Sequence, residues 1–513
     1  MDSSHQPRIC ISLCEPTVAA LEVAVASAVK TSDLIEVRLD CLDPLELENG
    51  ASLITKLLQE TRCESILTYR PAEQGGRRVL DDETRQAFWS AAIFSGSFYD
   101  VELDLARRFG SNESLGSLPI DWSRTICSYH DFAGVPAQLD QLFERLAETP
   151  ARVLKIAVQA DDATDCLPVF HLLERARAEG REMIALAMGT SGLSTRILGP
   201  SRGAFLTYAS PESGCATAPG QITARELKDI YRVEKLDKQT QIFGLMGRPV
   251  SHSISPYLHN RAFAALDMNA VYVPFDVGDV KAFVKRMIHP RTREINWNFR
   301  GLSVTAPHKT AVMDQLDWID TAAREIGAVN TIVAEGDALS GYNTDALGFI
   351  SPLEVKLGDL TQMRFAILGA GGAASAALWS LRQSGARATV FARDEAKARA
   401  LGEKFDAGWK PLAAASFADF DVVVNATPLG TARLFEDQAP ATSDQLRGAR
   451  LAYDLVYNPT DTRFLREARA AGCETMGGLA MLVAQAVDQF RLWTGETASE
   501  ELMYETARQA LEQ

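Results

Sequence analysis

The feature that most constrains the fold is an alternation of eight short β-rich runs with amphipathic stretches between residues 8 and 210. In stretches such as LDQLFERLAE and CLPVFHLLERARAEG, apolar residues recur with the period of a helix. Eight such units predict an N-terminal (β/α)8 TIM-type barrel, with a doubly wound open sheet as the alternative. The expected strands are 8–13, 34–40, 64–70, 98–103, 124–132, 152–158, 182–188 and 204–210.

Ionisable side chains lie in or directly after these apolar runs. A charge inside a strand is costly unless it is paired or used in chemistry. In a barrel the carboxyl ends of all strands meet at one mouth, where active sites lie. We therefore expect a site at this mouth, built from Glu36, Arg38, Asp40, Arg70, Glu102, His130, Lys155 and Arg196.

Lys155 in the sixth run and His130 at the end of the fifth predict covalent amine chemistry. Burial and cationic neighbours lower the pKa of a lysine from about 10.4, which frees its amine to attack a ketone. The iminium withdraws electrons, so a nearby imidazole can remove the proton α to it. Arg38, Arg70 and Arg196 would hold an anionic, hydroxylated substrate through charge-assisted hydrogen bonds.

Six motifs follow one another in this half: EVRLD, TYRP, SYHDF, LKIAV, STRILG and ATAPGQI. In sequence and order they resemble the motifs of type I 3-dehydroquinate dehydratases, over about residues 8–232. The resemblance implies that Lys155 is the Schiff-base lysine and His130 the general acid/base. The substrate contacts that it implies are Glu36, Arg38, Arg70, Arg196 and Gln221.

The chain departs from this family at two positions. The family often has Glu just before the paired glycines after the third strand, where this chain has Glu73-Gln74-Gly75-Gly76. Either Glu73 shifts into that role or the auxiliary carboxylate is missing. Thr217 replaces the family's Ser and keeps its hydroxyl group, so we count it among the substrate contacts.

After a charged helical segment at 224–240, a second strand–helix rhythm starts with QIFGLMG. Residues 364–385 form an apolar run, a Gly-rich turn and a helical run, which fits the dinucleotide fingerprint GxGxxA. The next apolar run ends in Arg393, which suits the 2′-phosphate of NADP, whereas NAD usually meets an acid there. Asp394 follows directly, so the two side chains give opposing signals.

Seven motifs occur in order along this half: SHSISP, SVTAPHK, GAVNT, NTDALG, GAGGAA, NATPLG and GGLAMLVAQA. They resemble the motifs of shikimate dehydrogenases over about residues 241–512, which implies Lys309 and Asp345 as the catalytic pair. The implied substrate contacts are Ser253, Ser255, Thr305, Asn330, Tyr457 and Gln485. The implied cofactor contacts are Gly369, Ala370, Gly371, Gly372, Ala373, Arg393, Thr427, Leu455 and Gly478.

This half also departs from its family twice. Where the family commonly has Asn-Arg-Thr at the adenosine ribose, this chain has Ala392-Arg393-Asp394, so we expect a weaker preference for NADP than usual. Ser303 stands where an Asn is frequent, which affects one substrate or positioning contact.

The two resemblances fit together, because the dehydratase product, 3-dehydroshikimate, is the substrate of the dehydrogenase. We therefore expect a bifunctional shikimate-pathway enzyme, an α/β barrel followed by a two-domain α/β dehydrogenase with a Rossmann-type NADP domain. The expected parts are 1–233 (dehydratase), 234–240 (linker), 241–348 (shikimate binding), 349–478 (NADP binding) and 479–513 (helices returning to the shikimate-binding domain).

Three other functions compete with this interpretation. A quinate/shikimate catabolic dehydrogenase fusion is one, although the Ser253–Ser255 pair favours shikimate. A non-catalytic sensor of these acids is another, and the retention of both Lys–His and Lys–Asp pairs argues against it. A Schiff-base aldolase explains only the first half.

Composition narrows the partners and the location. The net charge of −15 disfavours nucleic acid and anionic membranes as partners, which leaves small-molecule substrates. No uncharged apolar run approaches the roughly 20 residues of a membrane span. The eight cysteines are scattered singly without metal-ligand spacing, which favours reduced thiols over disulfides or a metal site. The start MDSSHQPRICISL leaves no room for a signal peptide, so we expect a cytoplasmic protein whose oligomeric state the sequence does not indicate.

Overall fold

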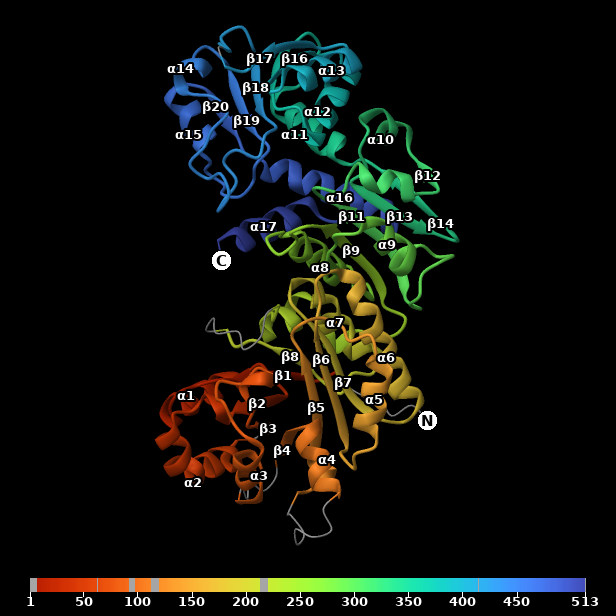
Figure 1. Ribbon diagram of the computed structural model, residues 1–513. Coiled ribbons are helices and arrows are strands. Elements are labelled where there is room, and N and C mark those ends of the chain that lie inside the picture. Colours follow the sequence, from red (N-terminus) through yellow and green to blue (C-terminus); the bar gives the residue numbers. More distant parts are fainter. Residues whose placement is uncertain are drawn as a thin grey trace.

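A computed structural model describes residues 7–61, 63–91, 97–111, 120–212, 220–413 and 415–512. Three β-sheets follow one another along the described chain, one with eight strands and two with six. Figure 1 shows an elongated molecule with the first sheet at its lower end, the second in the middle and the third at the upper end.

The first sheet is the expected barrel. Its parallel strands follow the order β7-β6-β5-β4-β3-β2-β1-β8, and a bridge between Met183 and Ala204 brings the two ends together. Each of the eight expected runs overlaps one strand. The strands are β1 (Ile9–Leu13), β2 (Leu34–Arg38), β3 (Glu64–Thr68), β4 (Phe98–Glu102), β5 (Thr125–Asp131), β6 (Val153–Gln159), β7 (Glu182–Met188) and β8 (Thr207–Ala209). The helices are α1 (Val18–Ala28), α2 (Pro44–Glu60), α3 (Asp82–Ala91), α4 (Leu103–Ser111), α5 (Leu139–Ala147), α6 (Cys166–Ala178) and α7 (Leu193–Leu198).

The inward face of the barrel strands changes from apolar to polar along their length. Leu34 at the start of β2 is followed on the same face by Glu36 and Arg38, and Val153 of β6 is followed by Lys155. Leu34 and Val153 belong to a separate buried apolar cluster inside the barrel. The buried charged residues therefore lie at the end where the strands finish.

The second sheet has the order β10-β9-β11-β13-β14-β12, with β9, β10 and β11 parallel and β13 antiparallel to both neighbours. The two C-terminal helices return to it, because Phe490 and Met503 share a buried cluster with Phe243 of β9 and Phe263 of α8. The strands are β9 (Gln241–Gly247), β10 (Ala270–Asp276), β11 (Asn298–Val304), β12 (Trp318–Ile319), β13 (Thr331–Glu335) and β14 (Ala338–Tyr342). The helices are α8 (Ser255–Ala265), α9 (Val280–Phe283), α10 (Thr321–Ile326), α16 (Leu479–Thr494) and α17 (Glu500–Leu511).

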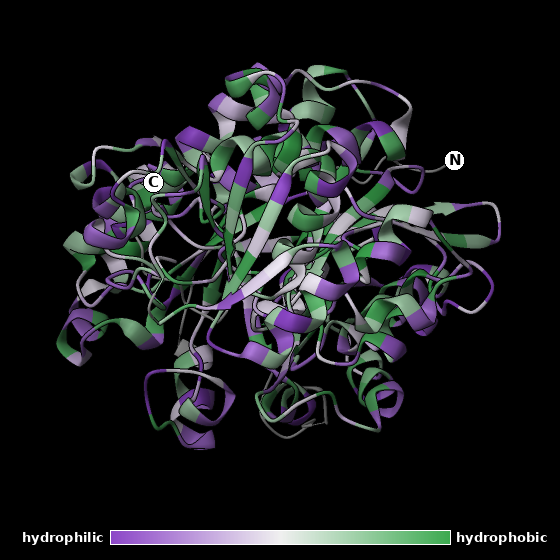
Figure 2. Ribbon diagram, turned by 90° about the horizontal axis from the view of Figure 1, so that it is seen from above, coloured by the Kyte–Doolittle hydropathy of each residue, from purple (hydrophilic) through white to green (hydrophobic). Residues whose placement is uncertain are grey.

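The third sheet is parallel throughout, with the order β17-β16-β15-β18-β19-β20. Numbered from its own first strand, this is the 3-2-1-4-5-6 order of the dinucleotide-binding fold, so the Rossmann-type prediction is confirmed. Figure 2, which views the molecule from above, shows helices that carry both hydrophilic and hydrophobic colours, as amphipathic helices do. The strands are β15 (Arg364–Leu368), β16 (Arg387–Ala392), β17 (Gly408–Pro411), β18 (Val422–Asn425), β19 (Leu451–Asp454) and β20 (Glu474–Met476). The helices are α11 (Asp345–Leu357), α12 (Gly372–Gln383), α13 (Glu395–Phe405), α14 (Ser443–Leu446) and α15 (Arg463–Ala470).

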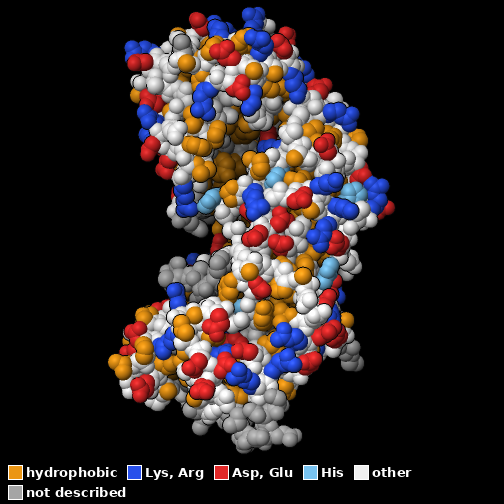
Figure 3. Space-filling view, in the orientation of Figure 1, with side chains coloured by type: hydrophobic (Ala, Val, Ile, Leu, Met, Phe, Trp, Pro, Cys, Tyr) orange, Lys and Arg blue, Asp and Glu red, His pale blue; other side chains and the backbone are white. Residues whose placement is uncertain are grey.

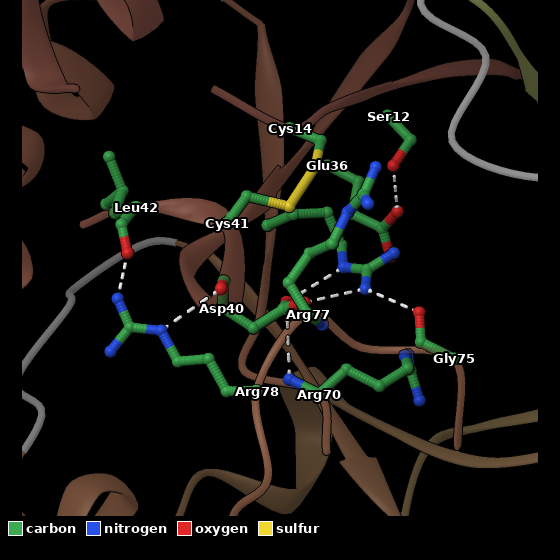
Figure 4. Close-up of a disulfide and its surroundings, with 11 residues drawn as sticks. Ser12, Cys14, Glu36, Asp40, Cys41, Leu42, Arg70, Gly75, Arg77 and Arg78 are labelled. Carbon is green, nitrogen blue, oxygen red and sulfur yellow. Dashed lines mark hydrogen bonds and ion pairs between the residues drawn. A yellow bond between two sulfur atoms is a disulfide. The ribbon is translucent and has the colours of Figure 1, made fainter. Parts of the chain in front are cut away.

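The expectation that all cysteines are reduced is wrong for one pair. Cys14 and Cys41 form a disulfide, with their Cα atoms 5.2 Å apart. The cause is the sheet register: β1 and β2 are neighbouring parallel strands, so the residues just beyond their ends lie side by side. Figure 4 shows the bridge beside Asp40 and the arginines around it. Among the described residues five cysteines are free, and Cys215 lies outside the described residues.

Candidate active sites

A cavity lies at the polar end of the barrel. All the described residues that the family resemblance implied for catalysis and substrate contact line it, and Thr217 lies outside the described residues. Asp40 and Glu102, which the sequence also placed at this mouth, do not line the cavity but pair with Arg38 and Arg70, which do. Tyr208 of β8 and Gln74 also line the cavity, and the sequence motifs predicted a site role for neither residue. The assigned residues in its wall are Glu36, Arg38, Arg70, His130, Lys155, Arg196 and Gln221.

The amine of Lys155 is buried among acceptors. Its Nζ atom donates to Asp100 Oδ2 at 2.7 Å and to Tyr208 Oη at 2.9 Å, and Glu36 Oε1 lies at 3.6 Å. The sequence led us to expect cations around this amine, but its direct charged contacts are carboxylates. Burial alone would raise the pKa of Asp100, yet the charges of Arg70 and Lys155 hold that pKa well below its usual value.

His130 is held as a neutral imidazole. Its Nδ1 atom lies 3.2 Å from the Nη1 atom of Arg70, which can only donate, so Nδ1 presents its lone pair. Burial, together with the positive charges of Arg70 and Lys155, holds the pKa of His130 well below its usual value. A neutral imidazole beside a buried amine can accept a proton from a bound substrate.

The three arginines of the site differ in their counter-charges. Arg38 makes a two-pronged pair with Asp40 at 2.8 and 2.9 Å, and Arg70 lies 2.7 Å from Asp100. The side chain of Arg196, in contrast, is buried and has no carboxylate partner in the described chain; its Nη1 atom donates to the Tyr208 carbonyl at 3.4 Å. Burial lowers the pKa of Arg196 to about 10. A buried guanidinium without a counter-ion is suited to an anionic ligand.

The structure separates the two alternatives at Glu73 and Gln74. Glu73 is exposed and does not line the cavity, whereas Gln74 lines it and accepts a 2.9 Å hydrogen bond from the backbone N–H of His130. The geometry therefore favours a site without the auxiliary carboxylate, with an amide in its place.

A second cavity, of about 330 Å³, lies between the second and third sheets. In Figure 3 a hollow with hydrophobic side chains on its floor separates the upper lobe from the middle of the molecule. All the residues assigned to the substrate and catalysis in this half meet in the cavity, together with three of those assigned to the cofactor. They are Ser253, Ser255, Thr305, Lys309, Asn330, Asp345, Tyr457 and Gln485, with Ala373, Leu455 and Gly478.

Lys309 and Asp345 form an ion pair in this cavity, with Nζ 2.5 Å from Oδ2. Asp345 is the first residue of α11, where the helix dipole favours a negative charge. Its other oxygen accepts from Asn330 Nδ2 at 2.8 Å, which fixes the carboxylate. The pair can exchange a proton with a ligand hydroxyl group.

Ser303, which stands where an Asn is frequent, lines this cavity and is fixed by two hydrogen bonds. Its hydroxyl accepts from Tyr272 Oη at 2.7 Å and donates to Gln489 Oε1 at 2.8 Å. Gln489 in turn donates to the carbonyl of Asn330 at 3.2 Å. Gln489 was not predicted from the sequence, although it lies four residues after Gln485 and therefore on the same face of α16.

The Gly-rich turn after β15 fits a dinucleotide. Gly369 has φ +122°, and a Cβ atom there would lie 2.8 Å from the carbonyl oxygen of Ala426. A Cβ atom on Gly371 or Gly372 would meet nothing within 4 Å, so open space faces the start of α12. The turn lies between β15 and β18, where the strand order reverses, with Ala370 inside it and Thr427 just after β18. Backbone N–H groups at such a helix start bind pyrophosphate.

The side chain of Asp394 does not oppose Arg393 at the expected site of the 2′-phosphate, as the sequence had suggested. Arg393 is exposed after β16. Asp394 is the N-cap of α13 and accepts from the Lys397 backbone N–H at 3.1 Å, which lowers the pKa of its carboxyl group. The carboxylate is thus directed to its own helix.

The described residues contain neither a membrane-spanning helix nor a metal-binding cluster. No helix there is long and apolar enough to cross a membrane. No group of three or more His, Cys, Asp or Glu side chains there is arranged to hold a metal ion.

Three known families match parts of the chain. Residues 9–238 match the type I 3-dehydroquinase family. Residues 245–332 match the shikimate dehydrogenase substrate binding domain, and residues 478–508 match the shikimate 5'-dehydrogenase C-terminal domain.

Whole proteins with the same succession of parts are similar to this chain. The chloroplastic bifunctional 3-dehydroquinate dehydratase/shikimate dehydrogenase of Arabidopsis thaliana is 34% identical over 525 residues, which cover 96% of this chain and 83% of the plant protein. The shikimate biosynthesis protein AroDE of Chlamydia pneumoniae is 29% identical, covering 94% of this chain and 95% of that protein. A crystal structure of a shikimate dehydrogenase in complex with NADP+ is 33% identical, with a TM-score of 0.51, and covers 54% of this chain and 97% of its own.

Proposed function

Because the chain belongs to the family of bifunctional 3-dehydroquinate dehydratases/shikimate dehydrogenases, we propose that it dehydrates 3-dehydroquinate and reduces the product to shikimate with NADPH. One observation carries the first reaction: the buried amine of Lys155, the neutral imidazole of His130 and the unpaired guanidinium of Arg196 share one cavity. They supply a nucleophile for a ketone, a base for the proton α to the iminium and a cation for the substrate carboxylate.

In the barrel, Lys155 attacks the C3 ketone of 3-dehydroquinate and loses water to give an iminium. His130 takes the C2 proton, and the electron pair expels the C1 hydroxyl group, which leaves as water with the proton from His130. Hydrolysis of the imine releases 3-dehydroshikimate and restores the amine. Arg196 would hold the substrate carboxylate, while Glu36 and Arg38 would bind hydroxyl groups.

In the second cavity, Ser253, Ser255 and Asn330 line the wall and would orient 3-dehydroshikimate. When bound, the reduced cofactor supplies the two electrons that convert the C3 ketone to an alcohol. Lys309 and Asp345 deliver the proton to the forming hydroxyl group, since Nζ and Oδ2 are already in contact.

NADP would lie across the carboxyl ends of β15 and β18, with its pyrophosphate at the start of α12. Gly369 to Ala373 and Thr427 would surround the pyrophosphate, and Arg393 would pair with the 2′-phosphate. Leu455 and Gly478 would contact the nicotinamide end, because both also line the substrate cavity.

We also propose which segments of the chain form each enzyme. The dehydratase would occupy 1–233, with 234–240 as linker; the dehydrogenase would comprise 241–348, 349–478 and the returning segment 479–513. We also propose a cytoplasmic location, which fractionation of cells with an antibody to the protein would test.

Absorbance assays test the two reactions separately. Addition of 3-dehydroquinate should give the enone absorbance of 3-dehydroshikimate, and addition of NADPH should then consume cofactor. Sodium borohydride added with 3-dehydroquinate should inactivate the dehydratase and leave a reduced adduct on Lys155. An adduct elsewhere, or none during turnover, would contradict the mechanism, and a catabolic role would show as faster oxidation of quinate than of shikimate.

A further inference from the structure

A third cavity, of about 700 Å³, lies at the boundary between the barrel and the second sheet. It shares no lining residue with either cavity described above. One wall comes from the barrel, from α6 and the segment after α7. The other wall comes from residues 237–242 and 293–300 of the second half. A ligand in this cavity would contact both halves.

The walls of this cavity are strongly cationic. Five of its lining residues are basic and two are acidic, in a chain whose net charge is −15. Both carboxylates are already engaged. Glu174 accepts from Arg202 at 2.9 Å, and Asp237 accepts from the Gln239 backbone N–H at 2.8 Å. The basic residues are Arg177, Arg202, Lys238, Arg293 and Arg300.

Several of these cations lack a counter-charge. The side chains of Lys238, Arg293 and Arg300 make no hydrogen bond or ion pair with another described residue. Burial and the nearby charge of Arg300 lower the pKa of Arg293, so like charges face each other here. Arg202 is more deeply placed, with a side chain 11% exposed and an Nε atom without a hydrogen-bond partner.

We propose that this cavity binds a small phosphorylated anion that carries at least two negative charges. Guanidinium groups donate paired hydrogen bonds to phosphate oxygens, and a phosphate dianion can accept from several arginines at once. A monocarboxylate would neutralise only one of the three unpartnered cations. The volume lies within the range of about 300–1,000 Å³ that is usual for small-molecule sites. The proposal does not depend on the two reactions assigned above.

Calorimetric titration with inorganic pyrophosphate tests the site. Saturating NADP+ is kept present, because the start of α12 is a second place where pyrophosphate could bind. We expect a single binding event in the wild type and a dissociation constant at least tenfold higher in the double variant Arg293→Glu/Arg300→Glu. The matched control, Arg387→Glu/Lys410→Glu, changes the net charge equally on exposed residues of the third sheet and should bind as the wild type does.

Two results with the wild type and these variants would overturn the proposal. One is the absence of pyrophosphate binding in the wild type, and the other is an equal loss of affinity in both double variants, which would show only a long-range charge effect. Dehydrogenase activity reports whether the variants are folded. If the double variant Arg293→Glu/Arg300→Glu fails to fold, Arg293→Gln/Arg300→Gln replaces it, and its affinity for pyrophosphate should fall at least fivefold. Unchanged affinity in this second variant, when folded, would also overturn the proposal.

Discussion

Arg70 connects the two reactive groups of the barrel through opposite effects. Its Nη2 atom pairs with Asp100, which also holds the Lys155 amine, and its Nη1 atom donates to His130. The same guanidinium therefore keeps a carboxylate charged and an imidazole neutral. Opposite charge states of neighbouring groups allow one of them to anchor the amine and another to accept a proton.

Dehydratase activity should require His130, but its pH profile should not show a titration at the usual histidine pKa. Since the base form is needed and the pKa is lowered, kcat/KM should stay level from pH 8 down to about 6, below the usual histidine pKa of about 6.5. His130→Ala should reduce dehydratase turnover about 10²- to 10⁴-fold and leave shikimate oxidation unchanged. Enone absorbance against pH measures both effects. A half-maximal loss at pH 6.5 or above would contradict the neutral assignment.

The pair Glu73 and Gln74 offers a matched comparison. Glu73→Gln should leave dehydratase turnover within about twofold, since the side chain is exposed. Gln74→Ala removes the acceptor of the His130 backbone N–H and should lower turnover about 2- to 12-fold, which corresponds to about 0.5–1.5 kcal/mol. The reverse order of effects would show that Glu73 has taken over the carboxylate role.

Cofactor choice should depend on Arg393 more than on Asp394. Arg393→Ala should raise the KM for NADPH by about 10- to 150-fold, equivalent to about 1.5–3 kcal/mol, and change NADH kinetics only a few-fold. Asp394→Thr keeps an N-cap and should favour NADPH by only a few-fold, because the carboxylate is directed to α13. Wild-type protein that uses NADH as efficiently as NADPH would contradict the assignment.

At the residue scale, the sequence predicted site residues that lie within recognisable motifs. It did not predict residues that contact them from outside those motifs. Glu102 was recognised in the fourth strand, but Asp100 was not, although the two lie on the same face by the alternation of a strand. Tyr208 resembles an ordinary core aromatic, and only the closed sheet brings its hydroxyl group to Lys155.

At the scale of secondary-structure elements, the disulfide between the segments after β1 and β2 lies beside residues of the dehydratase site. Cys41 follows Asp40, whose oxygens accept from Arg38 and from the backbone N–H of Arg77 (Figure 4). The bridge closes a segment with a sequence separation of 27, for which the chain-entropy model gives about 3–4 kcal/mol of stabilisation. It therefore ties the end of β1 to the segment that fixes Arg38.

Loss of this disulfide should weaken only the first half. In Cys14→Ser/Cys41→Ser, the thermal transition of the barrel should fall and the KM for 3-dehydroquinate should rise, with NADPH-dependent activity unchanged. Cys63→Ser, at a free and half-buried cysteine, is the control and should behave as the wild type. Calorimetry and mass spectrometry without reductant provide the measurements. Failure to find the linked peptides would show that the pair is reduced in the isolated protein.

At the same scale, the regular elements could be predicted because their patterns are local. The apolar run, Gly-rich turn and helix around Gly369 predicted the start of the third sheet. The pairing of Cys14 with Cys41 could not be predicted, because it depends on the register between two strands, which no local pattern records.

At the scale of the molecule, the two halves are joined by polar and apolar contacts. Asp162 Oδ2 accepts from the backbone N–H groups of Gly278 at 2.6 Å and Asp279 at 3.2 Å. Phe170 of α6 meets Trp297 with ring centroids 6.4 Å apart, within a buried cluster that continues through both halves. These contacts fix the relative placement of two catalytic sites that a flexible linker alone would leave free.

The Asp162 contact should contribute measurably to this docking. Partial burial raises the pKa of Asp162, but hydrogen bonds from the backbone N–H groups of Thr164 and Gly278 lower it by a larger amount. The net shift of the pKa is therefore downward. The stabilisation is then complete above the usual aspartate pKa of about 3.9 and is lost as pH falls through the lowered value.

Asp162→Ala should cost about 1.5–3 kcal/mol at neutral pH and separate the calorimetric transitions of the two halves, with little effect on either turnover. Asp140→Ala, at an exposed ion pair on α5, should leave the transitions unchanged. A single, unshifted transition in Asp162→Ala would show that apolar contacts alone hold the halves together.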